Sequence, residues 1–305
     1  MTDIAAIAGQ LRRDEPLAGH TTLRIGGPAA WFVLPADEAA LIAAVTWARQ
    51  AGVPCWLLGN GSNLLVPDEG VAGCVVATGT ACRWVRWEAG GIEVGAGYPV
   101  QRLLNEAGRH GLSGLEGLSG VPGTVGGAVV MNAGTAAGET SGVVVSARVL
   151  LPTGEVAEWG PADLGFGYRS SRLQAPGHVV LSARLRLLPG DPEAIRRDLA
   201  ARARRRRDTQ PLELPSAGSI WTNPPGDHAG RLVEAAACKG LRVGDAMVSP
   251  KHANFIVNVG AARAADVLAV MRTVRARVRE RFAIVLEPEI RWMLGQEDLH
   301  HRLDA

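Results

Sequence analysis

Glycine gathers at two places in this chain, and the larger cluster constrains the fold most. Seven of the 21 residues from Gly114 to Gly134 are glycine, and apart from Glu116 none is charged. The shorter cluster, Leu58–Leu65, follows an apolar stretch that predicts a short buried strand, Val53–Leu58. Glycine permits tight turns and close approach of backbone to a ligand. We therefore expect both clusters to be strand-to-loop junctions, because so apolar a stretch suits a solvated linker poorly.

Neither cluster matches the two common nucleotide loops. The pattern GxGxxG after a strand is absent, and so is GxxxxGK[ST]. Backbone N–H groups together with the Asn and Ser side chains of residues 59–63 could still hold a phosphate. The alternative is a pair of tight turns between strands. The presence of two such clusters in one chain favours a large, flat, partly charged ligand.

Charge and length limit the class of protein. The 305 residues carry 32 basic and 30 acidic side chains, a formal net charge of +2, and 47% are hydrophobic. This composition excludes a disordered chain and argues against a protein that mainly coats nucleic acid. The basic run Arg202–Arg207 lies on an amphipathic pattern without interleaved aromatics, so a solvated face is favoured over contact with a diphosphate or with nucleic acid.

Cysteine, histidine and hydropathy patterns predict a reduced, metal-free cytoplasmic protein. The four cysteines have no CxxC spacing, and we interpret Cys74 and Cys82 as small buried residues in or beside strands. The seven histidines show no ligand spacing. No signal peptide or long apolar run is present, so we expect neither export nor a membrane span.

Helical and strand periodicities alternate loosely and strands also cluster, which predicts an α+β fold. Asp37 should cap a helix that Gly52 ends, Pro99 should open a second one, and Asp191-Pro192 a third. The expected later elements are a helix near Ala229–Cys238, a strand Phe255–Val259, a long helix from Val267 to Phe282, and a final strand Ile284–Met293 that ends the ordered part.

Seven ordered motifs, spread over nearly the whole chain, carry a specific resemblance. Besides the two glycine clusters, the motifs are His20–Gly27, Phe166–Ser171, Pro215–Ile220 with Asn223-Pro224, Ser249–Phe255 and Glu287–Arg291. Together they resemble the UDP-N-acetylenolpyruvoylglucosamine reductase family, which makes UDP-N-acetylmuramate for peptidoglycan. The resemblance implies a two-part FAD-binding domain of the vanillyl-alcohol-oxidase (PCMH) type, residues 1–77 and 78–207, and a smaller C-terminal α+β substrate domain, residues 208–305.

The implied reaction reduces an enolpyruvyl ether to a lactyl ether, with NADPH as hydride donor and non-covalently bound FAD. The protein must then stabilise an enolate and supply a proton. The resemblance assigns the enolate to Arg169 and Glu289 and the proton to Ser219. From sequence alone, Arg169 would be a surface residue, Glu289 a strand-end partner of Arg291, and Ser219 a turn serine.

The resemblance also distributes the binding residues. The cofactor set is Gly59, Asn60, Gly61, Ser62, Asn63, Gly123, Thr124, Gly126, Gly127, Ala128, Asn132 and Gly134. The substrate set is Asn223, Lys251, Asn254 and Arg291, with surface placement as the alternative for Lys251. Two departures stand out: Trp221-Thr222 replaces the usual aromatic-plus-Lys pair, and the chain is short, which resembles the compact branch without an extra substrate-covering loop.

The expected partner is a small-molecule substrate, with no nucleic acid, membrane or obligate protein partner. Two competing functions stay open. One is an oxidase of the same flavin-domain type, which would often tether its flavin through His or Cys. The other is a non-catalytic nucleotide-binding module, in which NADPH would not bleach the bound flavin.

Overall fold

The computed structural model describes residues 4, 7, 9–88 and 90–304. The chain divides into two compact units. Unit 1 contains residues 1–12, 31–60 and 73–206, and unit 2 contains residues 13–30, 61–72 and 207–305. Each unit has its own hydrophobic core. The predicted finer division at residues 77 and 207 stays a prediction.

Antiparallel pairing builds most of unit 1. Its larger sheet has the order β12 (Val156–Trp159), β11 (Val144–Leu150), β13 (Val179–Arg186), β7 (Gly91–Gly95), β6 (Val85–Glu88). Two short pairs accompany it, β8 (Leu112–Ser113) with β14 (Leu188–Pro189), and β9 (Gly134–Thr135) with β10 (Gly138–Glu139). Strand β13 lies within the predicted strand Val179–Leu188, but the predicted alternation holds only at its end: residues 179–183 are all buried, and only Arg184 and Arg186, on either side of buried Leu185, are exposed.

A second sheet has the order β1 (Gly9–Pro16), β2 (Pro28–Pro35), β5 (Val71–Ala77), β3 (Cys55–Leu58). Its last two strands are parallel, with Cys55 opposite Cys74 and Leu58 opposite Ala77. Cys74 and Cys82 are buried, which confirms the sequence interpretation. The edge strand β1 was not predicted, because its side chains are mostly exposed and its sequence, Gly-Gln-Leu-Arg-Arg-Asp-Glu-Pro, lacks apolar alternation.

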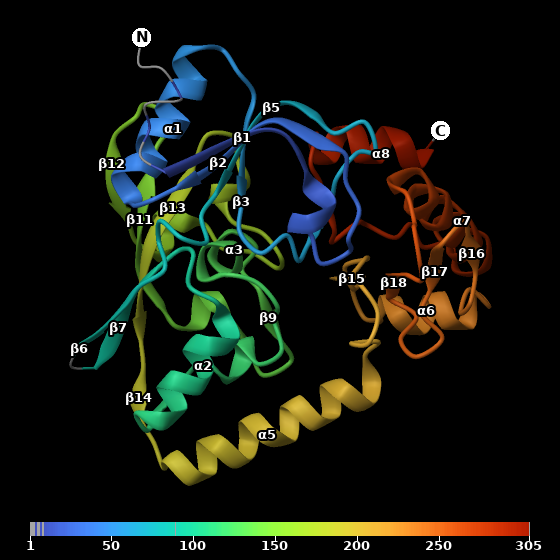
Figure 1. The fold of residues 1–305 in the computed structure, drawn as a ribbon. Helices are drawn as coiled ribbons and strands as arrows, with labels where there is room; N and C mark the ends of the chain where they lie inside the picture. The colour runs from blue at the N-terminus through green and yellow to red at the C-terminus, as the bar shows by residue number, and fades with distance from the viewer. Residues whose placement is uncertain (1–3, 5–6, 8, 89, 305) are drawn as a thin grey trace. The chain divides into compact units, whose positions relative to one another are not determined.

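The described α-helices of unit 1 are α1 (Glu38–Gln50), α2 (Val100–Arg109), α3 (Val125–Val130), α4 (Pro161–Leu164) and α5 (Pro192–Thr209), which runs three residues past the unit boundary. Three of them, α1, α2 and α5, follow their sequence signals, whereas α3 and α4 were not predicted. Asp37 caps α1 by accepting the N–H of Ala40 at 2.8 Å, as predicted. Helix α3 packs against β13 and β7 (Figure 1). This packing places residues 125–130 of the second glycine cluster (Gly114–Gly134) over the centre of the larger sheet.

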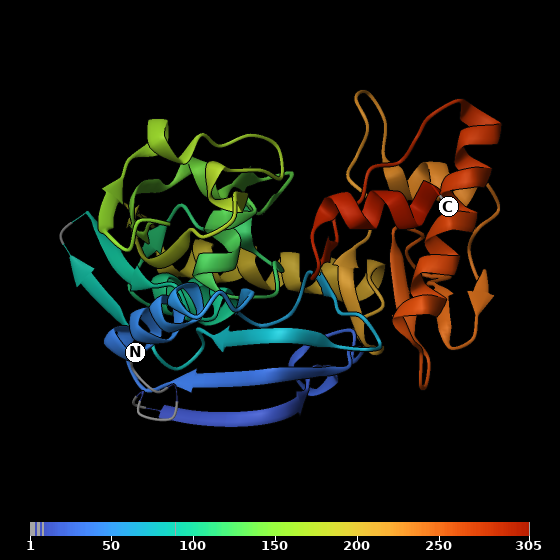
Figure 2. The ribbon, with the colours of Figure 1, turned by 90° about the horizontal axis from the view of Figure 1, so that it is seen from above.

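In the described part of unit 2, a four-stranded antiparallel sheet accompanies the α-helices α6 (Ala229–Ala235), α7 (Ala264–Phe282) and α8 (Gln296–Asp304). The sheet has the order β15 (Ser216–Ser219), β18 (Phe255–Asn258), β17 (Ala246–Val248), β16 (Arg242–Val243). Helix α7 packs on β17 and on α8, and Figure 2 shows these two helices side by side in red. Helix α7 and strand β18 were both predicted.

The end of the chain differs from its prediction. The expected strand Ile284–Met293 is wrong: only β19 (Arg291–Trp292) is a strand, and it pairs in parallel with β4 (Leu64–Leu65). Pro288 lacks the N–H that a longer strand would need. The order also continues beyond it, because α8 buries Leu299 and Leu303, one helical turn apart, against α7. Within the described ranges, no helix is both long and apolar enough to cross a membrane.

Candidate functional site

The two glycine clusters meet inside unit 1 at Gly59 and Thr124. Gly59 follows strand β3, and a Cβ on Gly59 would lie 2.7 Å from the Thr124 Oγ1. Thr124 is the N-cap of α3, where its hydroxyl accepts the N–H of Gly127 at 3.4 Å. A side chain on residue 59 would therefore push the clusters apart, which explains the glycine there in packing terms.

Close packing continues along the second cluster. A Cβ on Gly126 would lie 2.8 Å from the Ala96 Cβ, and the Gly126 N–H donates to the Ala96 carbonyl at 2.8 Å. Gly123 has a φ of +128°, in the region that favours glycine, and its carbonyl accepts the N–H of Val100. Ala128 is buried within α3, whereas Gly127 is exposed. The predicted cofactor residues 123–128 thus form one rigid junction between loop and helix.

The junction presents backbone donors. Among the described residues, none accepts a hydrogen bond from the backbone N–H of Asn60, Gly123 or Thr124. All three belong to unit 1. Unpaired N–H groups at glycine-rich turns are a common way to bind anionic oxygen. In its chemistry, this part of unit 1 suits a phosphate or diphosphate.

The remainder of the first cluster packs within unit 2. Gly61 has a φ of +57°, a Cβ there would lie 2.2 Å from the His20 carbonyl oxygen, and its own carbonyl accepts the N–H of Thr22 at 3.1 Å. Asn63 Nδ2 donates to the Glu289 carbonyl at 3.1 Å. The Asn63 carbonyl in turn accepts the N–H of Arg291 at 3.0 Å. The loop 61–63 is therefore fastened to the motif that carries Glu289.

Ser219 and Glu289 lie on neighbouring segments of unit 2. Ser219 ends strand β15, and the next carbonyl, that of Ile220, accepts the N–H of Glu289 at 2.8 Å. The antiparallel bridge between Trp221 and Pro288 continues this pairing. Both Ser219 and Glu289 are half-buried. The structure thus brings together two of the three residues predicted to be catalytic.

The predicted substrate residues of unit 2 have protein partners. Asn223 is exposed, and its Oδ1 accepts the N–H of Ala229 at 3.0 Å, at the start of α6. Lys251 Nζ donates to the Arg207 carbonyl at 2.5 Å and lies 3.9 Å from Glu213 Oε2.

Burial lowers the pKa of the Arg291 guanidinium. Asn254 is only 5% exposed, and its side-chain amide bonds to both backbone groups of Trp221.

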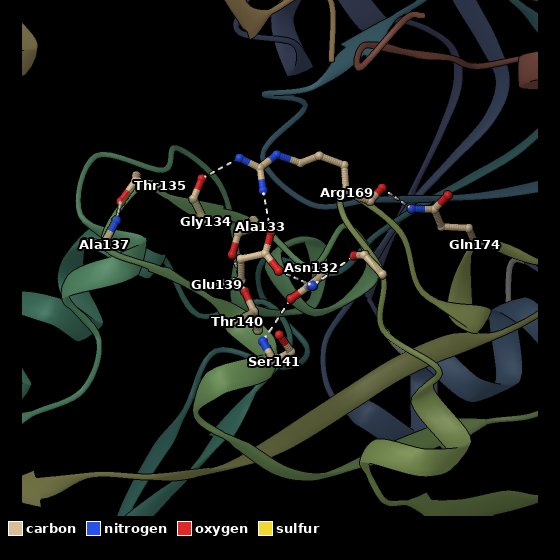
Figure 3. Close-up of polar contacts among 11 residues, drawn as sticks. Asn132, Ala133, Gly134, Thr135, Ala137, Glu139, Thr140, Ser141, Arg169 and Gln174 are labelled. Carbon is tan, nitrogen blue, oxygen red and sulfur yellow. Dashed lines mark hydrogen bonds and ion pairs between the residues drawn. The ribbon is translucent and has the colours of Figure 1, made fainter. Parts of the chain in front are cut away.

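Arg169 lies in unit 1 beside the hairpin β9–β10 (Figure 3). Its Nη2 donates to the Gly134 carbonyl at 2.8 Å, and its Nη1 lies 3.4 Å from Glu139 Oε1. Asn132, predicted to approach the cofactor, is 1% exposed, and its Nδ2 donates to Glu139 and to the Gly167 carbonyl. Predicted residues Asn132, Gly134 and Arg169 therefore form one polar cluster.

Sequence reasoning missed Glu139. Its signal was available, because Glu139 is the one charged residue between Glu116 and Arg148. An isolated charge in a long uncharged run points to a specific partner, which in this structure is Arg169. Among the described residues, no group of three or more His, Cys, Asp or Glu side chains could hold a metal ion.

Comparison with known proteins gives consistent matches over the chain. Residues 210–293 match the family model of the UDP-N-acetylenolpyruvoylglucosamine reductase C-terminal domain, and residues 29–160 match that of an FAD binding domain. The chain is 46% identical over 284 residues to UDP-N-acetylenolpyruvoylglucosamine reductase 2 of Symbiobacterium thermophilum, covering 93% of this chain and 92% of that one. It is 48% identical over 288 residues to the reductase of Anaeromyxobacter dehalogenans, covering 94% and 87%.

A solved structure agrees with these sequence matches. The crystal structure of UDP-N-acetylenolpyruvylglucosamine reductase from Thermus caldophilus aligns with a TM-score of 0.79 at 43% identity, covering 93% of this chain and 99% of that one. The matches confirm the predicted α+β fold with its FAD-binding domain.

Proposed function

The chain belongs to the UDP-N-acetylenolpyruvoylglucosamine reductase family, and from this premise we propose how its own residues carry out the reduction. It is an FAD-dependent oxidoreductase of peptidoglycan precursor synthesis. The reaction adds hydrogen across the alkene of UDP-N-acetylglucosamine enolpyruvate, giving the lactyl ether UDP-N-acetylmuramate. A hydride goes to the terminal alkene carbon and a proton to the adjacent carbon. We expect the enzyme to act in the cytoplasm on this small-molecule substrate.

The glycine junction of unit 1 fits the cofactor. FAD carries a diphosphate, which needs several hydrogen-bond donors at a place where backbone can approach closely. The N–H groups of Asn60, Gly123 and Thr124, which have no acceptor in the described part of the chain, meet this need together with the close contact at Gly59. When bound, the cofactor supplies the hydride that it takes from NADPH. The protein's residues have to bind the substrate, stabilise the negative charge and deliver the proton.

Arg169 is proposed to hold the substrate carboxylate. As hydride arrives, negative charge spreads onto this carboxylate as an enolate. A guanidinium stays charged at any physiological pH and can meet two carboxylate oxygens at once. Its N–H groups would stabilise the enolate more strongly than the neutral alkene, which is the condition for accelerating the step.

Ser219 is proposed to donate the proton to the carbon that bears the ether oxygen, and Glu289 to stabilise the enolic form. What supports this pairing is the hydrogen bond between the Glu289 N–H and the Ile220 carbonyl, which fixes Glu289 beside the residue that follows Ser219. A serine hydroxyl is a weak acid. The hydroxyl can act as the proton donor here because the enolate is strongly basic at carbon. The proton then moves directly from the hydroxyl oxygen to this carbon over a short distance.

An anaerobic two-step experiment tests the function. The yellow protein is mixed with NADPH until its flavin absorbance bleaches, and the enolpyruvyl nucleotide is then added. Rapid return of the absorbance, with one lactyl product formed per flavin, is expected. Failure of the nucleotide to restore the colour would contradict the proposed function, and failure of NADPH to bleach it would favour a non-catalytic nucleotide-binding module.

A further inference from the structure

Arg169 is held in an uncommon backbone conformation by its neighbours. Its φ is +53°, in the left-handed region that few non-glycine residues adopt. The side chain is 16% exposed and reaches the hairpin β9–β10, where the Gly134 carbonyl and Glu139 Oε1 accept from different nitrogens of the guanidinium (Figure 3). Strained conformations persist only where the surroundings determine them, which makes the partners of Arg169 informative.

Asn132 in turn orients the carboxylate of Glu139. Asn132 Nδ2 donates to Glu139 Oε2 at 2.9 Å and to the Gly167 carbonyl at 2.9 Å, and Asn132 Oδ1 accepts the N–H of Ser141 at 2.9 Å. Asn132 is nearly fully buried and also has a positive φ, +42°. One Glu139 oxygen therefore faces Asn132 while the other faces Arg169.

We propose that Glu139 and Asn132 are positioning residues for Arg169, an inference that rests on the proposed role of Arg169 as the group that holds the substrate carboxylate. A guanidinium is planar with its donors in a fixed fork, so two acceptors on separate nitrogens set both its plane and its direction. Asn132 fixes the Glu139 carboxylate, and Glu139 with the Gly134 carbonyl fixes the fork. The proton and hydride transfers themselves do not involve Glu139 or Asn132.

The competing explanation is a salt bridge that serves stability only. If the pair between Arg169 and Glu139 served stability only, its loss would lower the unfolding temperature without acting selectively on one half-reaction. Misplacement of a substrate-holding group instead acts on the rate, because an error of about 1 Å can slow a reaction about 100-fold. The two explanations therefore differ in which measurement changes when Glu139 loses its charge.

The test is Glu139→Gln made in the wild-type and in the Arg169→Ala background. In the wild-type background we expect reoxidation of the reduced protein by the enolpyruvyl nucleotide to slow about 10–100-fold, with bleaching by NADPH unchanged within about twofold. In the Arg169→Ala background the same change should alter reoxidation by less than about twofold, because a residue acting through Arg169 has nothing left to position. Thermal unfolding of each variant is measured alongside.

Two further variants sharpen the test. Thr135→Ala is the matched control: Thr135 is exposed on the same hairpin, and its hydroxyl accepts the Ala137 N–H at 3.3 Å (Figure 3), so wild-type reoxidation is expected. Asn132→Asp tolerates the positive φ but opposes the Glu139 carboxylate, so it should slow the same half-reaction.

The outcomes separate the two proposals. If wild-type protein is not reoxidised by the nucleotide, the proposed function fails and this inference fails with it. If wild-type protein is reoxidised but Glu139→Gln matches it, or slows the reaction equally in the Arg169→Ala background, only the positioning role is overturned.

Discussion

Asn254 and Trp221 exchange two hydrogen bonds: the Trp221 N–H donates to Asn254 Oδ1 at 2.9 Å, and Asn254 Nδ2 donates to the Trp221 carbonyl at 2.8 Å. The Ile220 N–H adds a third bond, to the Asn254 carbonyl at 2.9 Å. The buried Asn254 therefore continues the pairing of β15 with β18 beyond Ser219, where backbone alone would leave Trp221 unpaired on that side. The segment that carries Ser219 is fixed on one edge by Asn254 and on the other by residues 287–290.

Replacing Asn254 with Ala should destabilise unit 2. Two buried backbone groups of Trp221 would lose their partners, at a cost of about 2–4 kcal/mol in the free energy of unfolding. Urea unfolding measures this change. The control is Asn105→Ala, at an exposed position on α2, which should change stability by less than about 0.5 kcal/mol. An Asn254→Ala protein as stable as the control would contradict the structural role.

Adding a methyl group at Gly59 should weaken FAD binding. The new Cβ would lie 2.7 Å from Thr124 Oγ1, so the two glycine clusters must separate. Overpacking of this kind costs about 1–3 kcal/mol, so the Kd for FAD should rise about tenfold. Titration of the apoprotein with FAD gives the Kd directly.

Gly79→Ala is the matched control for Gly59, because a Cβ there meets nothing within 4 Å. It should bind FAD like the wild type. Removing the obstructing hydroxyl in Gly59→Ala with Thr124→Ala should recover part of the lost affinity. Equal affinities of the wild type and Gly59→Ala would show that contact between the clusters does not shape the cofactor site.

His252 should make stability depend on pH. Burial lowers the pKa of His252 below its ordinary 6.5, Lys239 lowers it further, and Glu234 acts in the opposite direction. Below about pH 6.5 the unfolded chain takes up a proton that the folded chain refuses, so the free energy of unfolding falls as the pH falls until the folded pKa is reached.

The His252→Gln variant is the control for this pH dependence, because it lacks only the His252 imidazole. The wild type should lose more stability between about pH 7.5 and about pH 5.5 than this variant does, because the other six histidines are common to both. Urea midpoints at the two pH values give the difference. An identical loss in both proteins would exclude His252 as the source.

Denaturation should release the flavin completely. The cysteines Cys55, Cys74, Cys82 and Cys238 all lie outside the glycine clusters, so no thiol there can tether the cofactor. Acid precipitation followed by centrifugation should leave the colour in the supernatant and a white pellet. A yellow pellet would indicate a covalent link and favour the oxidase alternative.

Much of the fold follows from local sequence signals. Asp37 before α1 and the apolar spacing of α7 predict those helices, because helix capping and the spacing of an apolar helix face depend only on residues a few positions apart in the sequence. The strand β1 and the segment 284–290 could not be predicted this way. Strand β1 is mostly exposed, and residues 287–290 bond to residues 220–222, which are distant in the sequence.

The candidate site divides in the same manner. The amino-acid composition alone marks the two glycine clusters as candidate ligand-binding loops. The roles of Arg169, Ser219 and Glu289 are implied only by the resemblance to a family. The sequence could not show that the side-chain amides of Asn254 and Asn132 form hydrogen bonds with other groups of the protein, because both sets of hydrogen bonds depend on tertiary packing. Their predicted contacts with substrate and cofactor stay predictions.

The proton transfer from Ser219 is the central claim, and Ser219→Ala tests it most directly. Anaerobic bleaching by NADPH should match the wild type within about twofold, whereas reoxidation by the enolpyruvyl nucleotide should slow by at least about 100-fold, the scale of a lost general acid. Ser216→Ala, which removes the same hydroxyl three residues earlier on β15, should leave both steps unchanged. Reoxidation of Ser219→Ala at the wild-type rate would contradict the account.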